Sequence, residues 1–306
     1  MKSKVVIAGG SGSLGKALAK SLLSQGYEVV LLSRTPSAKS EFKELSWDGV
    51  NVESSWAKLI PDSILINLAG ALVDRVPTKK NIDLLESSRV EPTLALVKAS
   101  NEYGAPELWL QMSTLAIYGD AGDAILSDVS LTSAANGPRQ MAGVAKAWEQ
   151  ASSGANPERM ITLRTAVVLQ KNSPALNRLA TITKWFLGGQ VASGKQYFSW
   201  IHETDFLRAV SFLIQNQDLN GTFHICSPNP VTNKVLMANL RKKLNRPSSP
   251  RTSRLAITIG SWLIFRTDPA LALTGRRAIP QRLLDAGFTF TYPTIEKALE
   301  ELIPNK

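Results

Sequence analysis

The sequence predicts an α/β fold in which helices cover both faces of a mostly parallel sheet. Apolar runs alternate with helical patterns through about the first 170 residues, which is typical of such sheets. A glycine-rich turn joins the first apolar run to the first helix. With 306 residues, of which 44% are hydrophobic, the chain can bury a substantial core. We therefore expect a sheet domain over residues 1–170, to which later segments return, and a smaller C-terminal cap over residues 171–306.

The expected elements follow the chain in a regular order. Strands are expected at residues 5–8, 28–32, 64–68, 108–112 and 161–169, and helices at residues 14–24, 79–103 and 136–153. Pro92 predicts a break in the helix over 79–103, since proline removes a backbone donor. Beyond residue 170 we expect helices near 174–187, 203–216 and 231–244, a strand at 222–226, and an exposed loop at 246–253.

Composition excludes several classes of protein. No stretch approaches the roughly 20 apolar residues that cross a bilayer, so no membrane partner is expected. The single cysteine, Cys226, excludes an internal disulfide framework and fits a reducing compartment, as a small buried residue rather than a nucleophile. The first strand begins almost at once, so no secretory signal is expected and the expected location is cytoplasmic. No cluster of His, Cys or carboxylates has metal-ligand spacing, and no metal is expected.

The formal charge of +10 is concentrated in one segment. Residues 241–282, from Arg241 to Arg282, contain ten Lys or Arg and one acid, Asp268. Such a segment could attract nucleic acid or another anion. No aromatic interleaving or helix-turn-helix spacing accompanies it, so a solvated face is favoured over a nucleic-acid interface.

The glycine loop is the most specific motif. Gly9, Gly12 and Gly15 stand three residues apart between the first strand and the first helix, a variant of the dinucleotide-binding fingerprint. The glycines allow a tight turn and a close approach of backbone to a pyrophosphate, and the N–H groups of Ser13 and Leu14 begin the helix that faces it. The sequence therefore predicts a Rossmann-type, doubly wound parallel sheet that binds a nicotinamide dinucleotide.

The end of the second strand indicates which dinucleotide. An NAD site usually has an acid about twenty residues after the loop, which binds the ribose 2′-hydroxyl. Here the strand ends at Ser33-Arg34 with no carboxylate. A hydroxyl and a guanidinium suit a 2′-phosphate, so NADP(H) is predicted in preference to NAD(H). An unrelated surface arginine is the alternative.

Motifs spread over most of the chain resemble those of the extended short-chain dehydrogenase/reductases, the NAD-dependent epimerase/dehydratase superfamily. They include the glycine loop, Asn67-Leu68-Ala69-Gly70, Ser113-Thr114-Leu115-Ala116-Ile117-Tyr118-Gly119, Leu163-Arg164-Thr165 and Trp200-Ile201-His202-Glu203-Thr204-Asp205. The chain is most similar to an atypical, uncharacterised epimerase-family subgroup with its own C-terminal domain. The features shared with it include Ser87-Ser88-Arg89-Val90, Trp148-Glu149 and Ala286-Gly287-Phe288.

The resemblance implies a catalytic Ser or Thr, Tyr and Lys. Thr114 matches the first and Lys146 the last, but Ala142 stands where the tyrosine is expected. Lys146 is then either a nicotinamide-ribose contact or a solvent-facing residue. Three explanations stay open: the chemistry needs no such acid, catalysis is lost, or a water or another side chain donates the proton. The candidate side chains are Tyr118, Tyr197 and His202.

The resemblance also implies cofactor contacts. Asn67, Leu68, Ala69 and Gly70 would pass the diphosphate and ribose. Ser113 would meet the nicotinamide ribose, and Thr165 the carboxamide. Trp47-Asp48 either flanks the adenine or simply packs.

Two functions remain in competition. The first is an NADP(H)-dependent oxidoreductase, epimerase or dehydratase on a small polar or sugar-like substrate, with Arg89, Trp185, Tyr197 and Trp200 as candidate lining. The second is a non-catalytic NADP(H)-binding sensor or interaction protein. Helix pairs in such folds often make dimers, so a homodimer is an expectation for which the sequence shows no interface.

Overall fold

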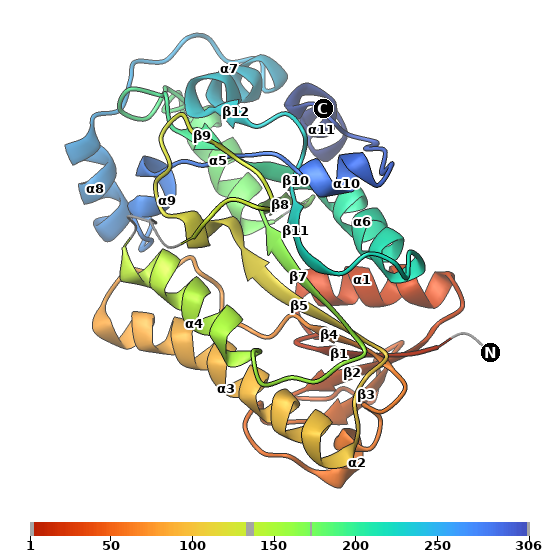
Figure 1. The fold of residues 1–306 in the computed structure, drawn as a ribbon. Helices are drawn as coiled ribbons and strands as arrows, with labels where there is room; N and C mark the ends of the chain where they lie inside the picture. The colour runs from red at the N-terminus through yellow and green to blue at the C-terminus, as the bar shows by residue number, and fades with distance from the viewer. Residues whose placement is uncertain (1–2, 133–137, 172, 305–306) are drawn as a thin grey trace.

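A single parallel sheet organises the protein. The computed structural model describes residues 3–132, 138–171 and 173–304. Seven strands pair in the order β11-β7-β5-β4-β1-β2-β3, all parallel (Figure 1). Their bounds are β1 Lys4–Ala8, β2 Glu28–Ser33, β3 Lys43–Ser46, β4 Ile64–Asn67, β5 Leu108–Thr114, β7 Arg159–Thr165 and β11 Gly221–Ile225. The chain order reverses between β1 and β4, which is the switch point where ligands bind in such sheets.

Helices cover both faces of this sheet. The bounds are α1 Ser13–Ser24, α2 Ser54–Ala57, α3 Lys79–Tyr103, α4 Val144–Ala151 and α6 Glu203–Gln215. Figure 1 shows α3 and α4 side by side on one side of the sheet and α1 and α6 on the other. Leu18 and Phe206 share one core with Ile7, whereas Trp56 and Trp109 belong to a second core. Apolar strands buried on both faces produce this doubly wound fold, and the predicted fold class is confirmed.

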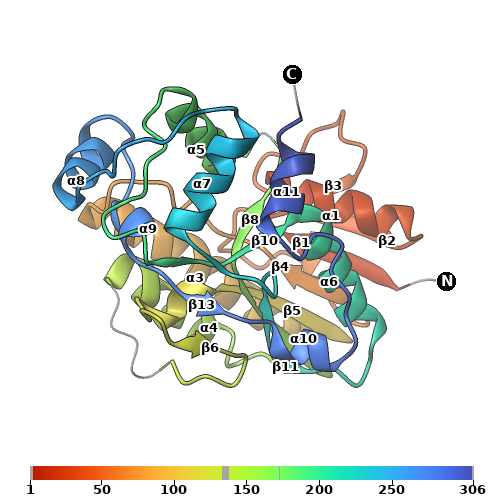
Figure 2. The same ribbon diagram turned by 90° about the horizontal axis from the view of Figure 1, so that it is seen from above.

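The C-terminal part of the chain adds a cap and also returns to the sheet. Helices α5 Pro174–Lys184, α7 Asn233–Lys243 and α11 Ile295–Leu302 lie together at one end (Figure 2). Their core contains Leu176, Trp200, Leu236 and Leu299. The remaining elements of this part include α8 Arg254–Leu263, α9 Ala270–Leu273, α10 Gln281–Asp285, β8 Val167–Leu169, β9 Tyr197–Phe198, β10 Trp200–His202, β12 Val231–Thr232 and β13 Arg277–Ala278, which pairs with β6 Ile125–Leu126.

Three expectations about elements need correction. Helix α3 runs unbroken through Pro92, whose ring lies against the Gly49 turn, and Thr93 donates its hydroxyl to the carbonyl of Arg89 (2.7 Å). The strand expected at 161–169 is divided at Ala166 into β7 and β8, which join different sheets. The helix expected at 136–153 starts as a π-turn, η2 Arg139–Gly143. Residues 136 and 137 lie outside the described residues.

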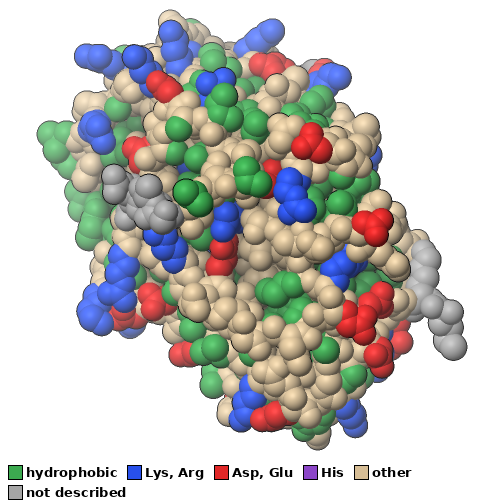
Figure 3. Space-filling model, in the orientation of Figure 1, with side chains coloured by type: hydrophobic (Ala, Val, Ile, Leu, Met, Phe, Trp, Pro, Cys, Tyr) green, Lys and Arg blue, Asp and Glu red, His purple; other side chains and the backbone are tan. Residues whose placement is uncertain are grey.

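No helix in the described part of the chain is long and apolar enough to cross a membrane. Three arginines of the basic segment make different contacts within the protein. Arg241 donates to the carbonyl of Gly188, Arg246 lies over the ring of Phe186 at 4.9 Å, and Arg282 donates to the carbonyl of Thr222 (2.7 Å). Figure 3 shows the face of the molecule seen in Figure 1, where Lys and Arg side chains are scattered over the upper part among hydrophobic ones.

Candidate cofactor and substrate site

Of the three fingerprint glycines, two have no room for a Cβ atom and one has. A Cβ on Gly15 would lie 2.6 Å from the Cα of Gly10, so this glycine lets α1 pack on the loop. A Cβ on Gly9 would lie 2.8 Å from the backbone of Leu68 and Ala69, and Gly9 has a φ of +75°. A Cβ on Gly12 would meet only the Gly9 carbonyl, at 3.6 Å. The fold therefore requires Gly9 and Gly15, whereas Gly12 borders open space.

The first turn of α1 is available to an anion. Gly12 is the N-cap residue, and no side chain caps the helix, whose first turn also holds no acid. The free N–H groups at Ser13 and Leu14 and the helix dipole therefore favour a negative group beside Gly12. The Ser13 hydroxyl donates to Oε1 of Gln170 (3.3 Å), which brings the end of β8 next to the loop. The cradle fits the diphosphate of a dinucleotide.

The strand ends beside this loop lie as the sequence predicted. β2 pairs with β1 up to Leu32, so Ser33 and Arg34 follow directly at the same edge as the glycine loop. Ser33 is buried, and its Oγ accepts from the N–H of Thr35 (3.3 Å), whereas Arg34 is exposed. The guanidinium can therefore reach a group bound at this edge.

The turn after β4 is built by Asn67. Its Oδ1 accepts from the N–H of Ala69 (3.1 Å), and its Nδ2 donates to Thr93 (2.9 Å) and Gln111 (3.1 Å). Asn67 is fully buried, so its side chain shapes the turn, and the backbone of Leu68 and Ala69 lies against Gly9 of the glycine loop. Trp47 is buried as well and donates to the carbonyl of Asn51 (3.1 Å). Its ring packs against that of Trp56, with the centroids 5.2 Å apart.

A cavity of about 310 Å³ lies over the C-terminal ends of β5 and β7. It is bounded by α3, η2, α4 and the segment that contains α9. Thr114 and Thr165 line it at the strand ends, and Arg89 and Tyr197 line it from α3 and β9. Of the other expected lining residues, Trp200 is fully buried in the cap core and Trp185 is 70% exposed, and neither borders this cavity. Another hollow, of about 460 Å³, lies between α1 and α6 and contains none of the predicted residues.

The π-turn η2 and helix α4, which follows it, present only some of their residues to the cavity. Met141 and Ala145 line it, together with Val144 and Trp148, whereas Ala142 and Lys146 do not. Ala142 is buried elsewhere and Lys146 is exposed. The pair with tyrosine–lysine spacing on the cavity wall is thus Met141 and Ala145, one residue earlier than expected. Lys146 is exposed and does not line the cavity, and its contact with the nicotinamide ribose stays a prediction.

The three candidate proton donors have different surroundings. Tyr118 is buried outside the cavity: its hydroxyl bonds to Nε2 of His224 (2.8 Å) and accepts from Nη1 of Arg164 (2.7 Å). His202 caps α6 by accepting from the N–H of Thr204 at Nδ1 (3.1 Å) and bonds to Glu301 through Nε2 (3.0 Å). Both side chains are thus held by contacts within the protein, and neither lines the cavity. Tyr197 alone of the three lines the cavity.

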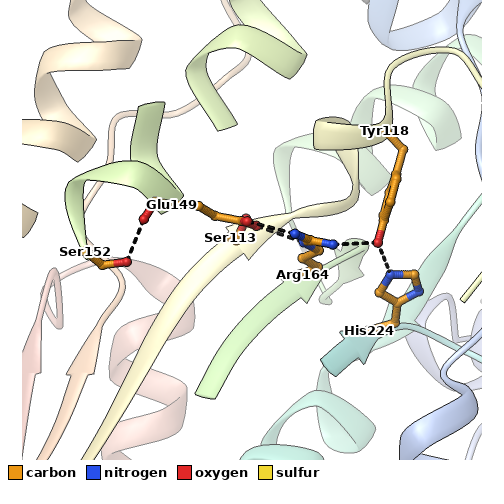
Figure 4. A network of polar contacts seen from close by, with 6 residues as sticks. All are labelled: Ser113, Tyr118, Glu149, Ser152, Arg164 and His224. Carbon is orange, nitrogen blue, oxygen red and sulfur yellow. Dashed lines mark hydrogen bonds and ion pairs between the residues drawn. The ribbon is translucent and has the colours of Figure 1, made fainter. Parts of the chain in front are cut away.

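Ser113 belongs to the same network as Tyr118, behind the cavity wall (Figure 4). Its hydroxyl donates to Oε1 of Glu149 (2.5 Å), and Arg164 grips Glu149 through Nε and Nη2, both at 2.9 Å. Burial opposes the charge of Arg164, but the paired carboxylate raises the pKa of the guanidinium. The Ser113 hydroxyl thus donates to α4, and the expected contact of Ser113 with the nicotinamide ribose stays a prediction.

His224 completes the network in its neutral form. Burial, opposed by the nearby Asp128, lowers the pKa of His224 to about 4. Its Nδ1 lies 3.1 Å from the carbonyl of Ile279 and must donate to it, so Nε2 accepts the Tyr118 hydroxyl. Asp128 also accepts from the backbone N–H groups of His224 and Arg282. The sequence does not show this network, because its hydrogen-bonded partners lie up to 154 residues apart.

Thr114 and Thr165 are the cavity hydroxyls at the strand ends. Thr114 accepts from the N–H of Ala116 (3.2 Å) and so begins the short helix η1 Leu115–Tyr118. Thr165 donates to the carbonyl of Leu163 (3.1 Å). The hydroxyl hydrogen of Thr114 can therefore be donated to a ligand, whereas that of Thr165 is already used. Cys226 is fully buried, and burial raises the pKa of its thiol well above the usual value, as expected for a packing residue.

Comparison with known proteins agrees with this geometry. Residues 5–226 match the family model of the NAD dependent epimerase/dehydratase family, and residues 257–302 match DUF1731, a domain of unknown function. An epimerase family protein of Mycobacterium leprae is 31% identical over 303 residues, which is 97% of this chain and 95% of that protein. An epimerase family protein of Staphylococcus aureus is 27% identical over 97% of this chain and 98% of its own length.

Two solved structures are also similar. The human epimerase family protein SDR39U1, isoform 2, with NADPH, has a TM-score of 0.84 at 25% identity, over 98% of both chains. A nucleoside-diphosphate sugar epimerase from Corynebacterium glutamicum has a TM-score of 0.76 at 27% identity, over 98% of this chain and 57% of that one. The family model spans well over half of this sequence, and the structural likeness extends through the cap. The chain belongs to the NAD-dependent epimerase/dehydratase family, within the extended short-chain dehydrogenase/reductases, and carries a DUF1731 C-terminal domain.

Proposed function

We propose that the protein is an NADP(H)-dependent oxidoreductase whose small-molecule substrate occupies the cavity over β5 and β7. One observation carries the proposal: the uncapped start of α1, with open space at Gly12, lies at the same sheet edge as Arg34 and that cavity. The N–H groups of Ser13 and Leu14 would hold the diphosphate, and Ser33 and Arg34 the 2′-phosphate. The NADPH in the human relative's structure supports the choice of NADP(H).

The cavity residues supply polar groups on one side of the substrate. When bound, NADP(H) exchanges a hydride with the substrate carbon. Reduction of a carbonyl then requires a proton at its oxygen, and oxidation requires that proton to leave. Thr114 would donate a hydrogen bond to this oxygen, because its own lone pair already accepts from Ala116. Tyr197 would transfer the proton, as the only one of the three candidate donors on the cavity wall.

The second candidate function is non-catalytic NADP(H) binding. Met141 and Ala145 favour it, because neither side chain can donate a proton at the positions that face the cavity. The cofactor cradle would be the same in both cases. The two functions differ only in whether hydride leaves the bound cofactor.

The test is oxidation of NADPH, followed by its absorbance, with a panel of aldehydes, ketones and keto acids. We expect turnover with at least one class, a loss of about 100-fold or more in kcat for Tyr197→Phe, as for other general acids, and a loss for Thr114→Ala. Tyr103→Phe, at the exposed end of α3, is the matched control and should keep full activity. Binding of NADPH without turnover of any compound would replace this function by the second candidate.

A further inference from the structure

The cavity wall has an unbalanced positive charge. Arg75, Arg89 and Arg276 line it, with Asp268 as the acidic residue. Asp268 is already satisfied, since it accepts from Nε2 of Gln140 (3.0 Å) and from the N–H of Ala270 (2.8 Å). Among the described residues, none of the three arginines forms an ion pair. A buried cation without an ion-pair partner is costly, so an anion bound here would be stabilised. The nearby carboxylate of Asp120 offsets this cost only in part, since the pKa of Arg276 is still lowered.

Arg276 is the arginine that is best placed to contact that anion. Its Nε donates to the carbonyl of Gly119 (2.7 Å), and its Nη2 lies 3.3 Å from Oγ1 of Thr274. No acceptor for its Nη1 is found in the part of the chain that the structure describes. A Cβ on Gly275 would lie 2.4 Å from the N of Tyr197, so the backbone before Arg276 is closely packed. Burial lowers the pKa of Arg276 to about 10, and the side chain stays charged at neutral pH.

Arg89 contributes charge but is held in place by contacts within the protein. Its Nη1 donates to the carbonyl of Leu85 and its Nη2 to that of Ala71, both at 2.9 Å. Its guanidinium lies over the ring of Trp148, 5.1 Å from the centroid. Arg75 donates through its Nε to the carbonyl of Leu72 (3.2 Å) at an exposed position, and its Nη atoms have no acceptor among the described residues. All three arginines raise the potential in the cavity, and Arg276 differs from Arg75 in that it is partly buried on closely packed backbone.

The polar side chains of the lining are largely used within the protein. Thr165 donates to Leu163, Thr274 donates to the carbonyl of Ala270 (2.8 Å), and Ser199 donates to the carbonyl of Arg276 (2.8 Å). The rest of the wall is mainly apolar, from Val73, Pro77, Leu85, Leu115, Ala116, Met141, Val144, Ala145, Trp148, Ala166, Val167, Phe198 and Leu271. The hydroxyl groups of a sugar would find few partners here, and leaving them unpaired would cost affinity.

We propose that this cavity binds a carboxylate with an apolar body: Arg276 binds the carboxylate and the apolar wall, with Trp148 and Met141, encloses the body. This inference rests on the proposed function for the position of the cofactor and names the substrate class of the same site. It replaces the sugar-like substrate expected from the sequence. In this arrangement the group to be reduced lies toward Thr114 and the carboxylate toward the C-terminal segment.

The test is calorimetric titration of the NADP⁺-saturated protein with phenylacetate, 3-phenylpropionate and 4-phenylbutyrate, each beside its neutral amide, and with UDP-glucose. We expect at least one acid to bind ten times more tightly than its amide and than UDP-glucose. Arg276→Gln should weaken that acid by about tenfold or more, the loss expected of a charge-assisted hydrogen bond, and leave the Kd of NADPH unchanged. Arg254→Gln, which removes an exposed charge from the same basic segment, is the matched control and should change neither.

The inference is overturned if acid and amide bind equally, if UDP-glucose binds most tightly, if no acid binds at millimolar concentration, or if Arg276→Gln has no effect. The comparison of acid with amide uses the wild type, so it stands even if the variant fails to fold. Because binding is measured without turnover, the two proposals fail separately. Absence of NADPH oxidation refutes the oxidoreductase, whereas equal binding of acid and amide refutes the carboxylate site.

Discussion

Replacement of Gly12 by alanine separates the role of this glycine in the fold from its role in binding. The new Cβ would meet only the Gly9 carbonyl at 3.6 Å, and the backbone angles of Gly12, φ −70° and ψ 164°, suit alanine. Reduced freedom of the unfolded chain should stabilise the variant by about 0.4–1 kcal/mol. Alanine is a poorer N-cap than glycine by a similar amount, about 0.5–1 kcal/mol, so the two effects should nearly cancel. We expect the free energy of unfolding of the apoprotein to change by less than about 1 kcal/mol.

The same methyl group should weaken cofactor binding. It would occupy the open space where a diphosphate approaches the first turn of α1. Loss of one hydrogen bond to a charged group costs about 1.5–3 kcal/mol. This corresponds to an increase of about 10- to 150-fold in the Kd of NADPH.

The assay combines NADPH titration by fluorescence with urea unfolding of the apoprotein. Gly15→Ala is the control, because its Cβ would lie 2.6 Å from the Cα of Gly10 and should destabilise the apoprotein itself. If Gly12→Ala bound NADPH as tightly as the wild type, the cofactor would not approach this loop and the reasoning would be refuted.

Three further predictions concern the network and the helix register. Burial lowers the pKa of His224 to about 4 from 6.5, so His224 contributes stability above pH 6.5 that is lost as the pH falls toward 4. In His224→Asn, the free energy of unfolding measured in urea should fall less between pH 7 and pH 4 than in the wild type, by up to about 3 kcal/mol. The same pH dependence in both proteins would count against this role of His224. Glu149→Ala leaves the mostly buried Arg164 unpaired and should cost about 3 kcal/mol or more in thermal or urea unfolding, whereas a cost below 1 kcal/mol would mean that water replaces the carboxylate. Met141→Tyr should place a phenol in the cavity and quench the fluorescence of bound NADPH differently from the wild type. Ala142→Tyr, at a buried position outside the cavity, should mainly lower the melting temperature. Similar behaviour of both variants would contradict the assignment of Met141, and not Ala142, to the cavity wall.

The sheet and the cofactor cradle could be predicted from the sequence because their signals are local. Apolar runs and the glycine spacing lie within short segments, and the loop, Ser33-Arg34 and residues 67–70 meet simply because parallel strands end at one edge. Short elements such as β3 and α10 carry too few residues for a recognisable period.

The residues of η2 and α4 that face the cavity could not be predicted from the sequence in the same way. The four-residue spacing is kept, but Met141 and Ala145 line the cavity in place of Ala142 and Lys146. Packing sets which side of the helix meets the cavity, and the sequence pattern does not show that packing. Arg276 was also missed as a site residue, because it reaches the cavity through a segment far along the chain, and in the sequence it is one of ten basic residues between 241 and 282. The structure is what distinguishes it from the others.

The most direct test of the account is titration of the wild-type protein with NADPH and NADH, beside Arg34→Ala and Lys39→Ala. Both residues are exposed and lie on the same loop, so Lys39→Ala controls for a simple change of charge. We expect the wild type to bind NADPH more tightly than NADH and Arg34→Ala to lose about tenfold or more in NADPH affinity, the value of one charge-assisted hydrogen bond. NADH binding should be unchanged in both variants. Preference for NADH, or equal weakening of both nucleotides in Arg34→Ala, would contradict it.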